Sequence, residues 1–134
     1  MSPIENYGDF FAHLNADFDD EVFHTVFAPD AYFRDPFQEV HTADAIIKIF
    51  RHMYRTLDNP KFEILESMGD EKKGFIRWSF VYGQERFEGV SHVRFDDKGR
   101  VVSHIDYWDA ASNVYEKIPI LGFILNRIKK HLKG

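Results

Sequence analysis

The sequence predicts a single α+β domain in which helices come first and an antiparallel sheet follows. Before Pro60 the apolar side chains recur at helical spacing, and after it they alternate with polar ones, as in strands buried on one face. At 134 residues the chain is long enough for one hydrophobic core and too short for two. Its 16 % aromatic content, with fourteen Phe, indicates a wide interior that is packed with rings or holds an apolar ligand.

Two short helices are expected first, over residues 9–27, with a break near residues 15–17 and an end at Pro29 and Asp30. A clearer helix follows over residues 42–57, because Thr42 is a good N-cap, Asp44 lies in the first turn, and residues 58–60 stop the helix. The apolar stripe of this second region consists of Ile46, Ile47, Phe50, Met53, Tyr54 and Leu57.

Four strands are expected after Pro60, at residues 62–65, 76–82, 86–95 and 101–108. Gly-rich and Asp-rich turns separate them, and Gly83-Gln84 is typical of a tight hairpin. Strands that follow one another in this way form an antiparallel sheet, and the helices are expected to cover one of its faces.

Asp35 is the most informative single residue. It ends an aromatic segment, residues 31–34, and is followed by Pro36 and Phe37, so it lies at an element boundary between apolar neighbours. There a carboxyl group can lose its contact with water, which raises its pKa and allows it to take a proton from a substrate. The alternative is an Asp-Pro pair that only forms a surface turn.

The composition excludes several classes of protein. The net charge is −5, and because residues 113–134 are net basic, the rest of the chain is more acidic still and would repel nucleic acid. There are no cysteines for disulfides or thiolate chemistry, the histidines lack metal-site spacing, and no phosphate-binding loop is present, so neither a metal nor a cofactor is expected. The first residues do not form a signal peptide, and we expect a cytoplasmic protein.

The order of elements and several local strings resemble the nuclear transport factor 2-like superfamily, which includes ketosteroid isomerase and the SnoaL-like polyketide cyclases. The resemblance runs from about Phe10 to Trp108 and implies a cone-shaped fold, with a curved sheet and a pocket between sheet and helices. The strings that carry it are Leu14-Asn15-Ala16, Phe27-Ala28-Pro29-Asp30-Ala31, Asp35-Pro36, Arg94-Phe95, Gly99-Arg100-Val101-Val102 and Tyr107-Trp108.

Ketosteroid isomerase uses a carboxylate base, a tyrosine and a protonated aspartic acid, which is a standard example of pKa tuning. The resemblance implies that Asp35 occupies the position of the base. The tyrosine position falls on Phe10 or Phe11 and the acid position on Ser91, so the groups that stabilise an enolate are missing and steroid isomerisation is disfavoured.

The last strand offers a replacement. Matching Trp108 to the pocket residue of isomerase-like members brings His104 and Asp106 to the same face by alternation. The expected catalytic residues are Asp35, His104 and Asp106. The expected pocket residues are Phe11, Tyr32, Phe50, Tyr54, Trp78, Phe80, Phe87, Ser91 and Trp108.

The last strand also allows the opposite orientation. Val101, Ile105 and Tyr107 form an apolar face, which would leave His104 and Asp106 in solvent. We favour the pocket orientation, because members of the resembled fold often dimerise through the outer sheet face, and a homodimer would bury the three apolar residues.

Two functions are therefore open. The first is a cofactor-independent isomerase or lyase that carries out proton abstraction, cyclisation or dehydration on a small apolar carbonyl compound. In it, Asp35 is the base, while His104 protonates or hydrogen-bonds the oxyanion and Asp106 orients it. The second is a non-catalytic module that binds an apolar ligand or a protein partner, since fold does not fix function.

The domain is expected to span residues 1–134, with a core at about 8–110 and a helical extension at about 112–133. Within the extension, residues 118–125 are apolar almost all round and residues 126–133 are basic. The segment is too short and too abruptly basic to span a bilayer. It could close the pocket, pack across a dimer or lie on an anionic membrane surface; packing is favoured because Pro119 and Gly122 interrupt an amphipathic helix.

Overall fold

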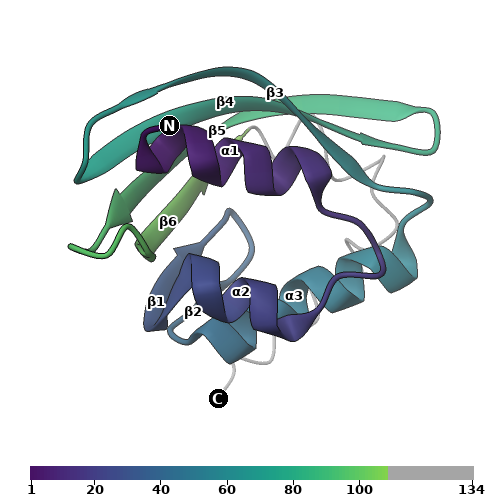
Figure 1. Ribbon diagram of the computed structural model, residues 1–134. Coiled ribbons are helices and arrows are strands. Elements are labelled where there is room, and N and C mark those ends of the chain that lie inside the picture. Colours follow the sequence, from purple (N-terminus) through teal and green to yellow (C-terminus); the bar gives the residue numbers. More distant parts are fainter. Residues whose placement is uncertain (109–134) are drawn as a thin grey trace.

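A six-stranded curved sheet with three helices forms the part of the chain that the computed structural model describes, residues 1–108. The strand order is β2-β1-β6-β5-β4-β3, and the sheet arches over α1 while α2 and α3 lie below (Figure 1). The helices are α1 (Pro3–His13), α2 (Asp20–Val26) and α3 (Ala43–Thr56), and the strands are β1 (Phe27–Arg34), β2 (Glu39–Val40), β3 (Lys61–Gly69), β4 (Lys73–Tyr82), β5 (Glu85–Phe95) and β6 (Val101–Tyr107). This confirms the predicted α+β class. The predicted extension at residues 112–133 lies outside the described residues.

Two of the predicted helix starts can be compared with their caps. Thr42 caps α3 as expected, because its hydroxyl oxygen accepts a hydrogen bond from the Ala45 N–H at 3.1 Å. In contrast, α1 begins at Pro3 and not at residue 9. Ser2 and Glu5 form a capping box there, so the polar first residues are a helix start and not a loose terminus.

The strands β1 and β2 are the elements that the sequence did not predict, and β1 is the longer. Its Pro29 and exposed Asp30 interrupt the alternation expected of a strand, and they lie in the irregular stretch between the paired residues Phe27 and Tyr32. β1 runs parallel to β6 and antiparallel to β2. The predicted antiparallel pairing is confirmed for β3, β4, β5 and β6, and the unpredicted β1 adds one parallel pair, so the sheet is mixed.

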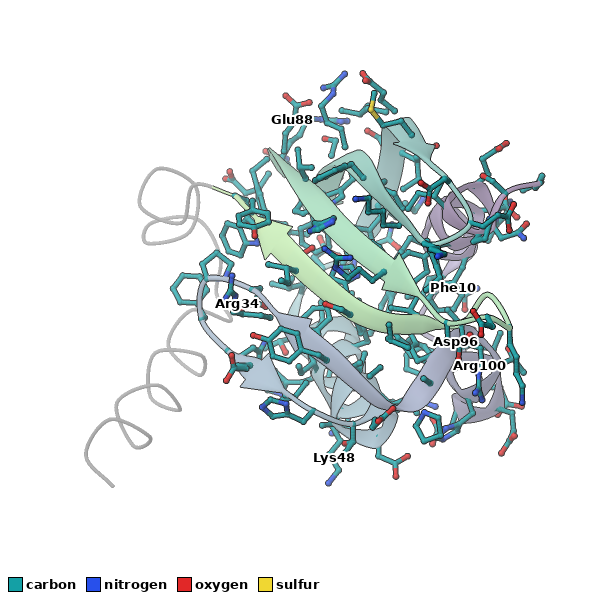
Figure 2. All side chains as sticks on the ribbon, turned by 90° about the vertical axis from the view of Figure 1, so that its left-hand side faces the viewer. Phe10, Arg34, Lys48, Glu88, Asp96 and Arg100 are labelled. Carbon is teal, nitrogen blue, oxygen red and sulfur yellow. The ribbon has the colours of Figure 1, made fainter. Side chains whose placement is uncertain are left out.

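The four later strands form the predicted meander. Gly83 has φ of 52° in the two-residue turn between β4 and β5, a conformation that glycine adopts without strain. At the β5–β6 turn, Asp96 accepts hydrogen bonds from the backbone of Lys98 and Arg100. Figure 2 shows Asp96 and Arg100 together at that turn, and Arg34 at the opposite end of the sheet. Arg34 immediately precedes Asp35, so the candidate base lies at the end away from this turn.

A bulge in the β5–β6 pair changes which residues of β6 face the core. Arg94 pairs with Ser103 but Phe95 pairs with Val101, so one residue of β6 is left over. As a result Val101 and His104 are both buried, although they are three positions apart. Val101 was predicted on the outer face, and the bulge is the reason that it is not.

Aromatic rings fill much of the space between the helices and the sheet. Phe23 and Phe27 are fully buried and stack on each other at 5.7 Å, while Tyr7 and Phe11 of α1 meet edge to face at 4.8 Å. Within residues 1–108, no helix is long and apolar enough to cross a membrane.

Candidate active site

The larger of two adjoining pockets has a volume of about 650 Å³ when its open mouth is included. It lies between α3 and the inner face of the sheet, and two carboxylates, Asp35 and Asp106, are part of its wall. The lining residues are Phe33, Asp35, Gln38, Ile49, Phe50, Met53, Leu57, Phe62, Trp78, Phe80, Phe87, Asp106 and Trp108.

The second pocket, of about 320 Å³, continues inward toward α1. It shares Phe50, Phe62, Trp78 and Asp106 with the larger pocket, so Asp106 borders both. The remaining lining residues are Phe11, Ile64, Ile76, Ser91 and His104. Together the two pockets form one largely apolar space with its polar groups on the side of β6.

Asp35 is held at the end of β1 by a tight turn. Its Oδ1 accepts hydrogen bonds from the N–H groups of Phe37 (2.8 Å) and Gln38 (3.0 Å), and its Oδ2 accepts one from Gln38 Nε2 at 3.1 Å. Burial raises the pKa of Asp35 to about 6, a rise that these hydrogen bonds oppose and that the charge of Asp106 reinforces. Both interpretations of the sequence therefore apply, since Asp35 forms a turn and also lies in a pocket.

Asp106 is held by a chain of buried side chains. His104 Nε2 lies 2.6 Å from Asp106 Oδ1, and the Tyr7 hydroxyl lies 2.6 Å from His104 Nδ1. Ser91 donates its hydroxyl to the same Asp106 oxygen and accepts a hydrogen bond from Trp78 Nε1 at 2.8 Å. The side chains of α1, β4, β5 and β6 thus fix one carboxylate.

The charge of Asp106 determines which groups donate in this series of hydrogen bonds. An ionised Asp106 can only accept, so His104 carries its proton on Nε2 and Ser91 donates to Asp106. An imidazole that carries its one proton on Nε2 accepts at Nδ1, and in that form Tyr7 is the donor. Burial and the charge of Asp106 raise the pKa of Tyr7 well above its usual value, which keeps this proton on the tyrosine.

The predicted site residues fall into three groups. Asp35 and Asp106 line the larger pocket, whereas His104 lines only the smaller one and has both ring nitrogens engaged. The predicted pocket residues that do line one of the two spaces are Phe11, Phe50, Trp78, Phe80, Phe87, Ser91 and Trp108.

Tyr32 and Tyr54 are the two corrections to the predicted pocket. Tyr32 precedes the inward-facing Phe33 on β1, so it points to the other side, where its hydroxyl donates to Glu39. Tyr54 follows Met53 on α3 and packs against Phe18, with ring centroids 6.0 Å apart. Neither residue lines the two pockets.

Tyr7 is the residue that the sequence analysis missed. The predicted helix began at residue 9, which left Tyr7 outside it. A helix drawn from Ser2 would have placed Tyr7 four residues before Phe11 and on the same face, toward the pocket. The position that the resemblance assigned to a tyrosine is occupied by phenylalanine, Phe10 or Phe11. A tyrosine, Tyr7, lies one helical turn earlier, and its hydroxyl contacts His104.

The charges of the site are all acidic. Among the described residues that line the two pockets there is no Lys or Arg, and residues 1–108 contain no group of three acidic or histidine side chains arranged to hold a metal ion. The arrangement can therefore accept protons and attract cations. It contains one indole N–H, on Trp108, that makes no hydrogen bond with residues 1–108.

The comparisons with known proteins agree with this fold. A profile of the SnoaL-like domain family matches residues 7–104. Among solved structures, a steroid delta-isomerase from Pseudomonas aeruginosa superposes with a TM-score of 0.65 at 20 % identity, covering 97 % of this chain and 91 % of that one. A putative SnoaL-like polyketide cyclase from Jannaschia sp. CCS1 gives 0.68 at 14 % identity, covering 84 % and 92 %.

A de novo designed protein with a curved β-sheet matches equally well, with a TM-score of 0.70 at 12 % identity and coverage of 95 % and 99 %. Because a designed protein shares the fold, these likenesses concern the architecture and leave the chemistry to the site residues. No match was found among curated protein sequences.

Proposed function

This chain belongs to the SnoaL-like domain family, within the nuclear transport factor 2-like superfamily, and we propose that it is a cofactor-independent enzyme that moves a proton on a small, largely apolar carbonyl compound. Isomerisation, cyclisation and dehydration all begin with such a step. The observation that carries the proposal is the presence of two carboxylates, Asp35 and Asp106, in the wall of one apolar pocket.

Asp35 is the proposed base. With a pKa of about 6 it is mostly ionised at neutral pH, yet it holds a proton about a hundred times more tightly than an exposed aspartate does. Its Oδ2 accepts one hydrogen bond, from Gln38, and so keeps a lone pair for a substrate C–H. The surrounding rings limit the contact of Asp35 with water, which raises this basicity.

Asp106 and His104 take supporting parts in the proposal. The charge of Asp106 contributes to the raised pKa of Asp35. Both ring nitrogens of His104 are engaged, so neither is free for a substrate. We assign His104 a positioning role: it holds Asp106, while Tyr7 fixes the tautomer of the imidazole. The indole N–H of Trp108 is the donor available to the carbonyl oxygen as negative charge develops there.

Exchange of carbon-bound hydrogen for deuterium tests the proposal without knowledge of the natural substrate. The protein is mixed with 2-tetralone or 2-indanone, both flat ketones, in deuterated buffer, and loss of the α-proton signal is followed by NMR. We expect exchange above the buffer rate, lowered about 10²- to 10⁴-fold by Asp35→Asn. Asp30→Asn, the same chemical change at an exposed position of β1, is the matched control. Equal exchange in wild type and Asp35→Asn would refute the assignment of the base.

A non-catalytic binding module is the second candidate, and one observation favours it. Two of the pocket's N–H donors, Gln38 Nε2 and Trp78 Nε1, are already bonded to Asp35 and Ser91, which leaves few groups to stabilise an oxyanion. For such a module we expect no exchange, equal ligand affinity in wild type and Asp35→Asn, and weaker binding in Trp78→Ala or Trp108→Ala.

A further inference from the structure

The larger pocket contains two negative side chains and no positive one among its described lining residues. Asp35 and Asp106 are both withdrawn from bulk water, and an apolar neutral ligand would remove the water that remains. Desolvation of two carboxylates with no cationic side chain beside them in the pocket is unfavourable unless a counter-charge or a proton replaces the water. A ligand that brings its own positive charge removes this cost.

Most of the free hydrogen-bonding atoms in the pocket are acceptors. Asp106 accepts the hydrogen bonds from His104 and Ser91 on Oδ1. Its Oδ2 accepts no hydrogen bond from residues 1–108. Asp35 Oδ2 accepts only from Gln38, and that amide uses its nitrogen for the bond, which leaves its oxygen as a further acceptor. Against these three acceptors stand two N–H donors, the Trp108 indole and the second hydrogen on Gln38 Nε2. The occupant must therefore donate more hydrogen bonds than it accepts.

The apolar wall also suits a cation. Trp78, Phe87 and Trp108 form a continuous ring surface, with Trp78 and Phe87 6.0 Å apart and Phe87 and Trp108 4.9 Å apart. Phe62 and Phe80 extend it, with centroids 4.8 Å apart. The faces of such rings attract a positive charge, most strongly where water is excluded, and their area also buries an apolar ring.

We propose that the pocket binds a small ring compound that carries a protonated amine, with the nitrogen held between Asp35 and Asp106 and the ring against Trp78 and Phe87. This inference rests on the proposed function for the use of the pocket and names the class of its substrate. Asp106, held by His104 and Ser91, anchors the cation, and Asp35, the proposed base, lines the same pocket.

The affinity for the amine should depend on pH through Asp35. Burial and the charge of Asp106 place its pKa at about 6, so Asp35 becomes neutral as the pH falls through that value and its attraction for the cation is lost. The other titratable groups facing this space are Asp106, His104 and, behind it, Tyr7. The lining residues from α3, β3, β4 and β5 carry no ionisable side chain.

Calorimetric titration with a matched pair of probes tests the inference. 2-Naphthylmethylamine and 2-naphthylmethanol have the same ring and nearly the same shape, and only the amine is charged between pH 5 and 8. At pH 7.5 we expect the amine to bind at least tenfold more tightly than the alcohol. Asp106→Asn and Asp35→Asn should each reduce this ratio at least fivefold, and Asp30→Asn, at an exposed site on β1, should leave it unchanged. Between pH 7.5 and pH 5 the ratio should fall in the wild type.

Several results would overturn the inference: equal affinity for the two probes, no binding of the amine at millimolar concentration, or an amine preference that survives both substitutions. Variants are compared only where their unfolding midpoints are at least as high as that of the wild type. Deuterium exchange on the same samples separates the two proposals. Exchange without amine preference refutes the inference alone, and amine preference without exchange refutes the proposed function alone.

Discussion

The carboxyl group of Asp35 carries an energetic cost that follows from its position. Its pKa is about 6 in the folded protein and about 3.8 in the unfolded chain, so the folded state binds the proton more tightly. The resulting stability is fully present below about pH 4 and is lost as the pH rises through 6, a difference of about 3 kcal/mol. At neutral pH the protein therefore folds in spite of an ionised Asp35.

Asp35→Asn should stabilise the protein at pH 7.5. The amide has the shape of the carboxyl and its oxygen can still accept from the N–H groups of Phe37 and Gln38, while the charge is gone. We expect a gain of about 1–3 kcal/mol in the free energy of unfolding, measured by urea titration, that disappears as the pH approaches 4. A variant that is less stable than wild type at pH 7.5 would contradict the raised pKa.

Tyr7→Phe should destabilise the protein and alter His104. The side chain of Tyr7 is 2 % exposed, and loss of its hydroxyl leaves His104 Nδ1 buried without a donor. We expect a loss of about 1–3 kcal/mol and a change in the ¹⁵N chemical shifts of His104, which report its tautomer.

Tyr54→Phe is the matched control for Tyr7→Phe. Within residues 1–108 the Tyr54 hydroxyl is buried and has no hydrogen-bond partner, and burial raises its pKa to about 12. Its removal should leave the stability equal or slightly higher and the His104 signals unchanged. If both tyrosine variants show the same loss in the free energy of unfolding, the hydrogen bond from the Tyr7 hydroxyl to His104 does not contribute to stability.

Sequence analysis identified the site residues whose immediate neighbours in the chain restrict their backbone conformation or mark the end of a strand. Asp35 stands out because Pro36 follows it between aromatic residues, and Asp106 because it precedes Tyr107-Trp108 at a strand end. Tyr7 could not be located in this way, since its partner His104 is 97 residues away and local patterns carry no information about such contacts. Tyr32 and Tyr54 were misplaced because residue type alone does not fix the side to which a ring points.

Among the elements, β6 shows where alternation stops being a reliable guide. Strict alternation groups Val101 with Ile105 and Tyr107, but the bulge beside Arg94 and Phe95 turns Val101 inward. A bulge depends on how two strands pair and leaves no clear mark in either sequence. β1 was missed for a related reason, because Pro29 is tolerated only where the pairing is irregular.

Gly89→Ala should deform the pocket through β5. A methyl group at this position would lie 2.5 Å from two ring atoms of Trp78 and 3.1 Å from Trp108 Cβ, so the indole must move. We expect a loss of about 1–3 kcal/mol in stability and weaker binding of 2-naphthylmethylamine, both measured by calorimetry.

Gly8→Ala on α1 is the control for this substitution. There the added methyl meets its nearest atom, on Ile64, at 3.6 Å, which is ordinary contact. Alanine also favours a helix interior, so the variant should gain about 0.5–1 kcal/mol and bind the amine normally. If Gly89→Ala binds the probe as well as Gly8→Ala does, the Trp78 wall is more adaptable than its packing indicates.

For the molecule as a whole, we propose that the outer face of the sheet meets a second copy of the chain, as expected from the resemblance. The register places Phe75, His92 and Ile105 in one row across three strands, and Arg77, Val90 and Tyr107 in the next. Phe75 and Tyr107 are 45 % and 53 % exposed. This face also carries both signs of charge, with Arg77 in the second row and Glu88 beside it, which a two-fold axis could place against each other.

Tyr107→Glu should separate this dimer. The substitution puts a charge at the β6 end of these rows while the side chain stays on the outer face, away from the pocket. Sedimentation velocity at micromolar concentration is expected to show a dimer for wild type and a monomer for the variant, with unchanged far-UV circular dichroism. A monomeric wild-type protein would refute the proposal.

The overall architecture was the most predictable property of the chain. Periodicity before and after Pro60 determined the class, and the hairpin at Gly83 determined the meander. The parallel pairing of β1 with β6 was not predictable, because the two strands are joined by all the intervening elements and no short pattern indicates that they meet.

That pairing has a consequence for how the protein folds. Tyr7 and His104 are 97 residues apart, and β1 gains its parallel neighbour only when β6, the last described strand, is in place. During synthesis the first two helices and β1 therefore leave the ribosome long before the strand that completes their side of the sheet. Contacts this distant in sequence slow folding, and until β6 arrives an unpaired edge of β1 is exposed to other chains.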